Sequence, residues 1–243
     1  MSNSNSHRML SLQQAAQHIK IPERELFHLV QRNEVPFIQR GDDICFEHCQ
    51  LDAWAQQNIM EISNKSLSVR HREAIADRTK RASEDTLVDR LFRPEWIEPA
   101  LTSKTKPGVL RDMVSLAVTT GLLYDDAAFL RELEARESVA STAVGGGVAL
   151  LHARYHDPYI CSDSFVVLGK AVKPLFFGAP DGDETDLFFL ICCTDDMLHL
   201  HTLARLCMLV QSDIMLGNLR DAPTAEEMYQ VLTDEETELL SKL

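Results

Sequence analysis

The sequence predicts two domains: a small, mainly α-helical N-terminal domain, and a larger C-terminal α/β sandwich whose mixed sheet is flanked by helices. A chain of 243 residues has room for two modest domains. The net charge differs between the same two parts of the chain. Residues 1–90 carry 12 Lys/Arg and 13 Asp/Glu (net −1), whereas residues 91–243 carry 12 and 24 (net −12), which together give the −13 of the chain. Near Leu91 the pattern also changes, from short helices to strands that alternate with helices.

Two short helices open the chain. Ser11 is expected to cap the first, whose apolar residues recur at helical spacing up to Ile19. Pro22 suits the first turn of the second helix. Asn33 stands where that helix needs a left-handed residue to end.

A hairpin and a third helix follow. The segment "FIQRGDDICFEH" predicts two strands that turn at Gly41 and Asp42. Leu51 and Trp54 are expected to face inward from the closing helix. Two helices, a tight break and a hairpin wing form a winged helix-turn-helix arrangement, so residues 1–60 are predicted to be a domain of that architecture.

Residues 61–90 are predicted to be a basic, helical linker. Between Glu61 and Ala82 there are six basic and three acidic residues and no Gly or Pro. The segment is either a solvated linker helix or a basic arm that contacts phosphates, and it could also pair two chains in a homodimer.

The C-terminal domain is predicted over residues 91–243. A helix that carries Val109 and Met113 on one face is expected to stop at Gly121. A second helix, three buried strands and two closing helices are expected at these segments in turn: "DDAAFLRELEARES", "GVALLHA", "SFVVLGKA", "DLFFLICC", "HLHTLARLCMLVQS" and "TAEEMYQVL". The uninterrupted apolar run "DLFFLICC" is typical of a central strand that is covered on both faces.

The N-terminal segment "LSLQQAAQHIKIPERELFHLVQRNEVPFIQRGDDICFEHCQLDAW" resembles the excisionase/MerR-type helix-turn-helix module. The resemblance implies that residues 23–32 form the recognition helix, and it makes Arg24, Arg32 and Arg40 candidates for DNA contacts. Residues 9–60 carry four basic and seven acidic residues, a poor balance for phosphate binding. Binding to DNA and binding to another protein both remain open for this domain.

The C-terminal motifs "ARESVASTAVGGGVALLHAR", "PLFFGAPDGDETDLFFLIC" and "LHLHTLARL" resemble enzyme IIA domains of the phosphotransferase system, of the fructose, mannitol and nitrogen-regulatory type. The resemblance implies that a small phosphocarrier protein transiently phosphorylates His152. It also implies that Arg136 and His199 flank the phosphate, and it makes Thr142 a further candidate for phosphate binding.

The chemistry agrees with this expectation. A neutral imidazole can accept a phosphoryl group, and an arginine can supply donors for its oxygens. Gly145, Gly146 and Gly147 permit a close turn before the strand of His152. One position departs from the family, because Leu151 stands where Pro is usual. His156 and His201 are expected to face solvent.

No metal and no cofactor are expected. "CFEHC" places Cys45, His48 and Cys49 close together, but a second ligand cluster is missing, so the six cysteines are interpreted as reduced, mostly buried thiols. No segment has the length and hydropathy of a membrane span, so no membrane insertion and a cytoplasmic location are expected.

The leading functional hypothesis is a regulatory protein of the phosphotransferase system, in which phosphorylation of His152 controls the binding of DNA or of a target protein. One alternative is a phosphocarrier that passes phosphate to a sugar-import permease. Another is a non-catalytic interaction protein, for which Leu151 is the sequence support.

Overall fold

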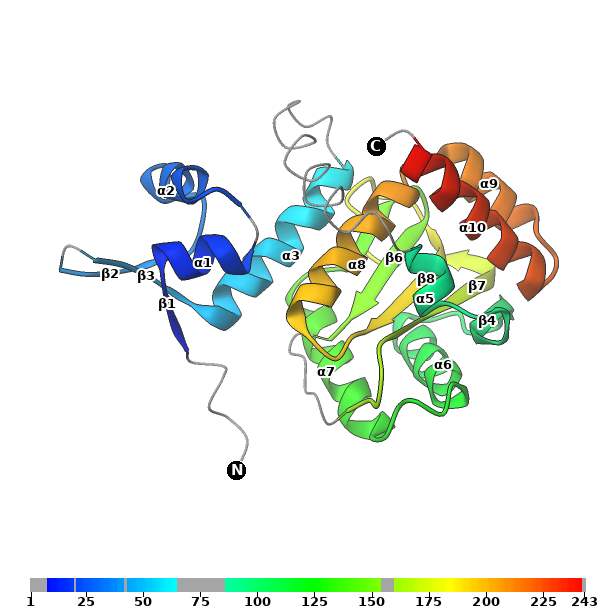
Figure 1. Ribbon diagram of the computed structural model, residues 1–243. Coiled ribbons are helices and arrows are strands. Elements are labelled where there is room, and N and C mark those ends of the chain that lie inside the picture. The colour runs from blue at the N-terminus through cyan, green and yellow to red at the C-terminus, as the bar shows by residue number, and fades with distance from the viewer. Residues whose placement is uncertain (1–7, 20, 42, 65–85, 154–159, 242–243) are drawn as a thin grey trace. The chain divides into compact units, whose positions relative to one another are not determined.

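Figure 1 shows the computed structural model, which describes residues 8–19, 21–41, 43–64, 86–153 and 160–241. Contacts divide the chain into two units, Met1–Ile59 and Met60–Leu243. Most of the predicted linker, residues 65–85, lies outside the described residues. Within the described ranges, no helix combines the length and the apolar composition that crossing a membrane requires.

The N-terminal unit contains a three-stranded antiparallel sheet in the order β1-β3-β2 and three helices. Its elements are β1 (Met9–Ser11), α1 (Leu12–His18), α2 (Glu23–Gln31), β2 (Ile38–Arg40), β3 (Asp43–Glu47) and α3 (His48–Asn64). The order of helix, helix, hairpin and helix follows the sequence expectation, but β1 was not expected. A strand of three residues is too short to show an alternating pattern.

The predicted signals at the helix ends are confirmed, with one shift. Ser11 caps α1 in a reciprocal capping box with Gln14. Asn33 has a φ of 57° after α2, and Gly41 has a φ of 63° in the hairpin. Pro22 is the N-cap of α2 rather than its first helical residue.

The C-terminal unit is built on a mixed five-stranded sheet in the order β4-β7-β8-β6-β5. Its strands are β4 (Ile97–Leu101), β5 (Ala143–Gly145), β6 (Val148–His152), β7 (Phe165–Leu175) and β8 (Thr185–Cys192). Its helices are α5 (Leu87–Leu91), η1 (Pro94–Trp96), α6 (Lys106–Thr119), α7 (Asp126–Val139), α8 (Asp196–Leu209), α9 (Asp213–Asp221) and α10 (Ala225–Ser241). Strand β8 is central, as its apolar run predicts, whereas α5, η1, β4, β5 and α9 were not expected.

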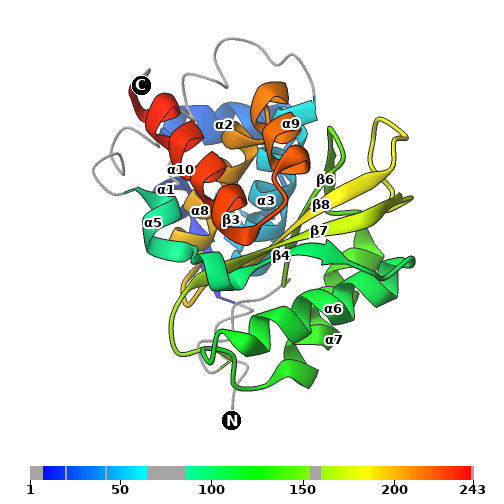
Figure 2. The same ribbon diagram turned by 90° about the vertical axis from the view of Figure 1, so that its right-hand side faces the viewer.

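Helices cover both faces of this sheet. Figure 2 shows α6 and α7 on one face and α8, α9, α10 and α5 on the other. A buried cluster joins the α6–α7 layer to the sheet and includes Met113, Phe129, Leu151 and Phe188. Because side chains alternate along a strand, Leu150 and His152 of β6 point to the opposite face from Leu151.

The pairing of β6 differs on its two sides. It runs parallel to β8 along its whole length, from Val148 opposite Leu187 to His152 opposite Ile191. The short β5 pairs with it only as far as Ala149. Among the described residues, no strand lies beside the end of β6 on that side, and Arg136 of α7 contacts His152 there.

A buried ion pair connects three helices on the second face. Arg205 of α8 donates through Nη1 to Glu236 of α10 at 2.8 Å, and the side chains are 0% and 1% exposed. The Glu236 carboxylate also accepts the backbone N–H groups of Leu87 and Val88, at 3.0 and 2.7 Å. Glu236 therefore satisfies the first amides of α5, whose N-cap Thr86 makes no capping bond through its side chain.

We expect Glu236→Ala to lower the free energy of unfolding of the C-terminal unit by about 3–5 kcal/mol, because it leaves the buried Arg205 charge uncompensated. Urea unfolding followed by the emission of Trp96, in a Trp54→Phe background, measures this unit. Glu134 is an exposed glutamate of α7, and Glu134→Ala should change the value by less than about 0.5 kcal/mol. Equal effects of the two substitutions would show that the buried pair is not a main source of stability.

Candidate active site

His152 is the last residue of β6 and is 1% exposed. Its Nδ1 lies 2.7 Å from the carbonyl oxygen of Leu150. A carbonyl only accepts, so Nδ1 carries the proton and donates, and the lone pair of the neutral ring is on Nε2. The strand thereby fixes both the orientation and the tautomer of this imidazole.

Arg136 reaches that lone pair from α7. Its Nε–H donates to Nε2 of His152 at 3.2 Å, and its Nη1 donates to the carbonyl of Ala140 at 2.9 Å. Arg136 lies in the last turn of α7 and is buried. The carbonyl of Ala140 thus anchors the guanidinium beside the one nitrogen of His152 that could act as a nucleophile.

His199 approaches His152 from α8. The ring centroids lie 5.2 Å apart with an interplanar angle of 51°, and His199 is 0% exposed. Asp195 caps α8 by accepting from the amide of Leu198 at 2.8 Å. His199 is the fourth residue of the helix rather than its first, and its own amide donates to the carbonyl of Asp195.

Thr142, the fourth candidate, is held by Glu137. Its amide lies 3.1 Å from Glu137 Oε1, and its hydroxyl donates to Oε2 at 2.6 Å. Lys106 of α6 pairs with the same carboxylate at 2.6 Å. Both donors of Thr142 thus bond to protein, so a contact from Thr142 to phosphate would require this arrangement to open.

Glu137 is a residue of this site that the sequence interpretation did not select. It holds the loop between Arg136 and β5 by accepting both donors of Thr142. Its place directly after Arg136 in "ARES" was the available signal. Its partners Lys106 and Thr142 come from other segments, and their proximity has no signature in sequence.

A residue of α9 holds the glycine turn before β6 in place by hydrogen bonding. Gly145, Gly146 and Gly147 have φ values of 100°, 62° and 77°, which side chains disfavour. Arg220 of α9 makes two bonds of 2.8 Å to the carboxylate of Asp186, and its Nη2 also donates to the carbonyl of Gly146. A Cβ on Gly147 would meet the ends of the Arg220 and Asp186 side chains, so a substitution there would strain the backbone and displace this ion pair.

The remaining histidines divide into two cases. His201 was expected to face solvent, but this is wrong, because the structure has it half-buried on α8. Burial, and then the positive charges of Arg205 and Arg90, lowers the pKa of His201 to about 4, so it is neutral at neutral pH. His156 lies outside the described residues.

The three arginines of the N-terminal candidate interface are all exposed. Arg24 lies on α2 and Arg40 on β2. Arg32, just after α2, pairs with Glu34 at 3.2 Å. A DNA phosphate would have to compete with that carboxylate for Arg32.

Among the described residues, no cysteine belongs to a group of three or more side chains placed to hold a metal ion. All six cysteines are free, four of them buried and two, Cys45 and Cys49, partly exposed. Burial raises the pKa of Cys193 to about 12, so this thiol is neutral at neutral pH.

The arrangement around His152 suits the transfer of an anionic group. A neutral imidazole presents Nε2, an arginine lies beside that atom, and a second imidazole lies across from it. Such a set can accept a phosphoryl group at nitrogen and supply positive charge and donors to its oxygens.

Comparison with known proteins gives a consistent result. Residues 90–235 match the family described as "Phosphoenolpyruvate-dependent sugar phosphotransferase system, EIIA 2". A nitrogen regulatory protein from Bradyrhizobium diazoefficiens is 32% identical over 145 residues, which cover 58% of this chain and 92% of that protein. The PTS system fructose-specific EIIABC component of Bacillus subtilis is 25% identical over 147 residues, or 60% of this chain and 23% of that protein.

The fold is similar to that of a solved protein. The crystal structure of nitrogen regulatory protein IIA-Ntr from Neisseria meningitidis superposes with a TM-score of 0.55 at 23% identity, covering 60% of this chain and 99% of that one. This likeness supports the α/β architecture of the C-terminal unit.

Proposed function

Because the chain belongs, through residues 90–235, to the EIIA 2 family of the phosphoenolpyruvate-dependent sugar phosphotransferase system, we propose that it is a phosphorylation-controlled regulator of that system. A phosphocarrier protein would place a phosphoryl group on His152. The phosphorylation state would then control what the N-terminal unit binds, either DNA or a target protein.

One observation carries the phosphorylation part of this proposal. The Nδ1–H of His152 donates to its own strand, which leaves Nε2 as the nucleophile, and the Nε–H of Arg136 is directed at that same atom. A histidine that served only packing would need no guanidinium at its lone pair, since burying that charge is costly.

The transfer step follows from this geometry. The lone pair of Nε2 forms a bond to phosphorus while the bond from phosphorus to the donor breaks, and its electrons leave with the donor. The imidazole gains positive charge, which the Nδ1–H bond to the Leu150 carbonyl disperses. Arg136 must then turn its N–H groups from Nε2 to the phosphoryl oxygens. Because His152 is 1% exposed, neighbouring side chains must also move to admit the donor.

The test is phosphoryl labelling of the full chain. The protein would be incubated with labelled phosphoenolpyruvate and the phosphocarrier relay, and the label mapped by peptide mass spectrometry. We expect label on the peptide that contains His152. An unlabelled chain would support the non-catalytic alternative, in which a site with Leu151 in place of the usual Pro no longer accepts a phosphoryl group.

A nitrogen regulatory protein among the relatives supports the regulatory half of the proposal, and so does the additional N-terminal unit. That unit has two helices, a hairpin and a third helix, with α2 exposed on its Arg24 side. This order is compatible with a winged helix-turn-helix domain that reads DNA, alone or as a homodimer.

DNA binding predicts a measurable dependence on salt. If Arg24, Arg32 and Arg40 each contact a phosphate, replacing all three with alanine should reduce the slope of log affinity against log salt by about 2.7, since each contact contributes roughly 0.9. Fluorescence anisotropy with genomic duplex fragments measures this slope.

The matched control replaces three exposed basic residues of the C-terminal unit, Lys104, Arg131 and Lys173. It removes the same charge and should leave the slope unchanged. No binding at low salt, or equal losses in the two triple variants, would favour a protein as the target.

A second function, a phosphocarrier that passes the group to a sugar-import permease, is supported by the similarity to the fructose-specific component of Bacillus subtilis. The two functions differ after His152 is labelled. Rapid transfer of the label to an EIIB-type acceptor would favour the carrier, whereas a stable label that changes binding by the N-terminal unit would favour the regulator.

A further inference from the structure

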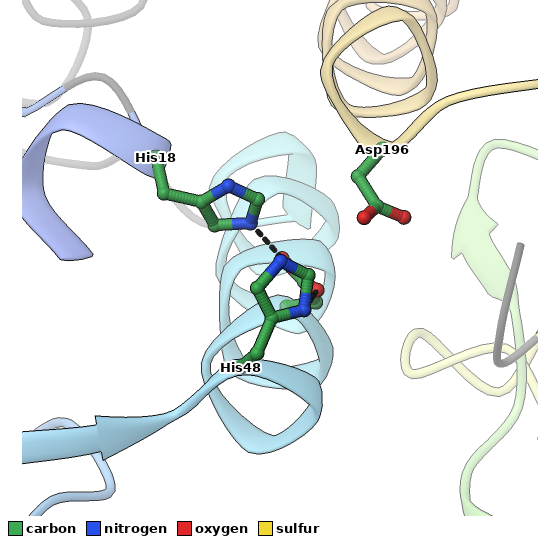
Figure 3. A group of neighbouring side chains, drawn as sticks. His18, His48 and Asp196 are labelled. Atoms are coloured by element: carbon green, nitrogen blue, oxygen red, sulfur yellow. Dashed lines mark hydrogen bonds and ion pairs between the residues drawn. The ribbon is translucent and has the colours of Figure 1, made fainter. Parts of the chain in front are cut away.

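Two histidines and an aspartate meet in the N-terminal unit, far in sequence from His152. His18 Nε2 lies 2.6 Å from Asp52 Oδ1, and His48 Nδ1 lies 3.0 Å from Asp52 Oδ2. The two imidazole centroids are 4.4 Å apart, and Figure 3 shows the rings of His18 and His48 next to each other. Ligand atoms of the three residues all lie within 4.8 Å of one another.

Secondary structure fixes this meeting. His18 ends α1, which begins directly after β1, and His48 opens α3, which begins directly after β3. Strands β1 and β3 pair with Met9 opposite Glu47, and the amide of His48 donates to the carbonyl of Arg8. Asp52 lies one turn after His48 on α3, so the pairing of two strands brings all three side chains together.

We propose that His18, His48 and Asp52 form a binding site for a divalent transition metal ion, with Zn²⁺ as the best fit. Two imidazole nitrogens and one carboxylate are the donor set that such ions use when one or more positions remain open to water or to another ligand. Ca²⁺ and Mg²⁺, which prefer oxygen donors, are not expected to bind here.

The spacing suits a metal. Ligands about 2.0–2.2 Å from a tetrahedral zinc ion are separated from one another by about 3.3–3.6 Å. The two nitrogen-to-oxygen distances are 2.6 and 3.0 Å, so each imidazole would have to move away from the carboxylate by about 1 Å or less to admit the ion. The ion would take the place of the protons that now lie between each imidazole and the carboxylate, and those protons would pass to solvent.

The three proposed ligand side chains are mostly buried, but each keeps some exposure to solvent. The side chains of His18, His48 and Asp52 are 16%, 20% and 12% exposed. Burial alone would raise the pKa of Asp52, but hydrogen bonds from His18 and His48, and their charges, hold it below its ordinary value. The carboxylate is therefore ionised and available as a ligand at neutral pH.

The test titrates the metal-free full-length protein with Zn²⁺, and with Co²⁺, whose visible absorption reports imidazole coordination. The variants are His18→Gln, His48→Gln and Asp52→Asn. Each should weaken binding by at least about 100-fold, since losing even a residue that only orients a ligand costs roughly 10–100-fold.

Two controls separate this site from other metal-binding groups. His28 is exposed on α2, and His152 belongs to another imidazole pair, which it forms with His199. His28→Gln and His152→Gln should both bind Zn²⁺ like the wild type. Loss of binding in His152→Gln would move the site to the C-terminal unit and overturn the proposal.

A measurement on the unaltered protein covers variants that fail to fold. Histidine modification by diethyl pyrocarbonate, mapped by mass spectrometry, should slow at His18 and His48 when Zn²⁺ is added and stay unchanged at His28. If Zn²⁺ protects neither histidine, or protects only the thiols of Cys45 and Cys49 from alkylation, the proposed ligand set is wrong.

Discussion

A His152→Gln variant is expected to take up no phosphoryl group from the phosphocarrier relay. Glutamine is close to histidine in size and keeps a polar side chain, but its amide has no nucleophilic lone pair. The expected result is complete loss of the label that the wild type acquires, measured at equal protein concentration and over the same time course.

His201→Gln is a matched control for this variant. His201 is another imidazole of the C-terminal unit, half-buried where His152 is buried, and the positive charges that act on it are those of Arg205 and Arg90 rather than that of Arg136. It should be labelled like the wild type. Label that persists in His152→Gln would move the acceptor to another residue, and mapping of the labelled peptide would identify it.

Replacing Arg136 with alanine is expected to slow phosphorylation of His152 by about 10³-fold or more, the lower end of what a transition-state arginine contributes in other phosphoryl transfers. The guanidinium is anchored by the Ala140 carbonyl beside Nε2, so it is in place before the phosphoryl group arrives. Single-turnover labelling, followed by quenched flow, measures this rate.

Arg131→Ala is the comparison, because Arg131 is an exposed arginine of the same helix. Its rate should stay within a factor of two of the wild type. Arg136→Lys should recover only part of the loss, because an ammonium group lacks the planar pair of donors. A rate in Arg136→Ala close to that of the wild type would show that Arg136 only orients the imidazole.

Long periodic segments of the chain were predictable. The central position of β8 follows from "DLFFLIC", which is apolar on both faces, and the end of α6 follows from the periodicity that Gly121 interrupts. Strands β1 and β5 were missed because each has three residues, and such a strand is defined by its partner rather than by its own pattern.

The candidate site was predictable only as far as its motifs extend. His152, Arg136 and His199 stand in recognisable segments, and the structure brings them together. The Glu137 contacts to Lys106 and Thr142, and the pair of Arg205 with Glu236, join distant segments whose pairing leaves no periodic signal. The cluster of His18, His48 and Asp52 was missed for the same reason, because it depends on the pairing of β1 with β3. The sequence grouped His48 with Cys45 and Cys49, which are close to it in sequence, rather than with His18 and Asp52.

Because β5 pairs with β6 only as far as Ala149, the end of β6 can be reached from both faces of the sheet. Arg136 belongs to the helical layer on one face of the sheet, His199 belongs to the layer on the other, and both reach His152 at this uncovered edge. Elsewhere the sheet separates the two layers. A doubly negative group bonded to Nε2 would therefore attract residues on helices of both layers. A change of charge at one atom could in this way alter the packing of helices on both faces of the sheet.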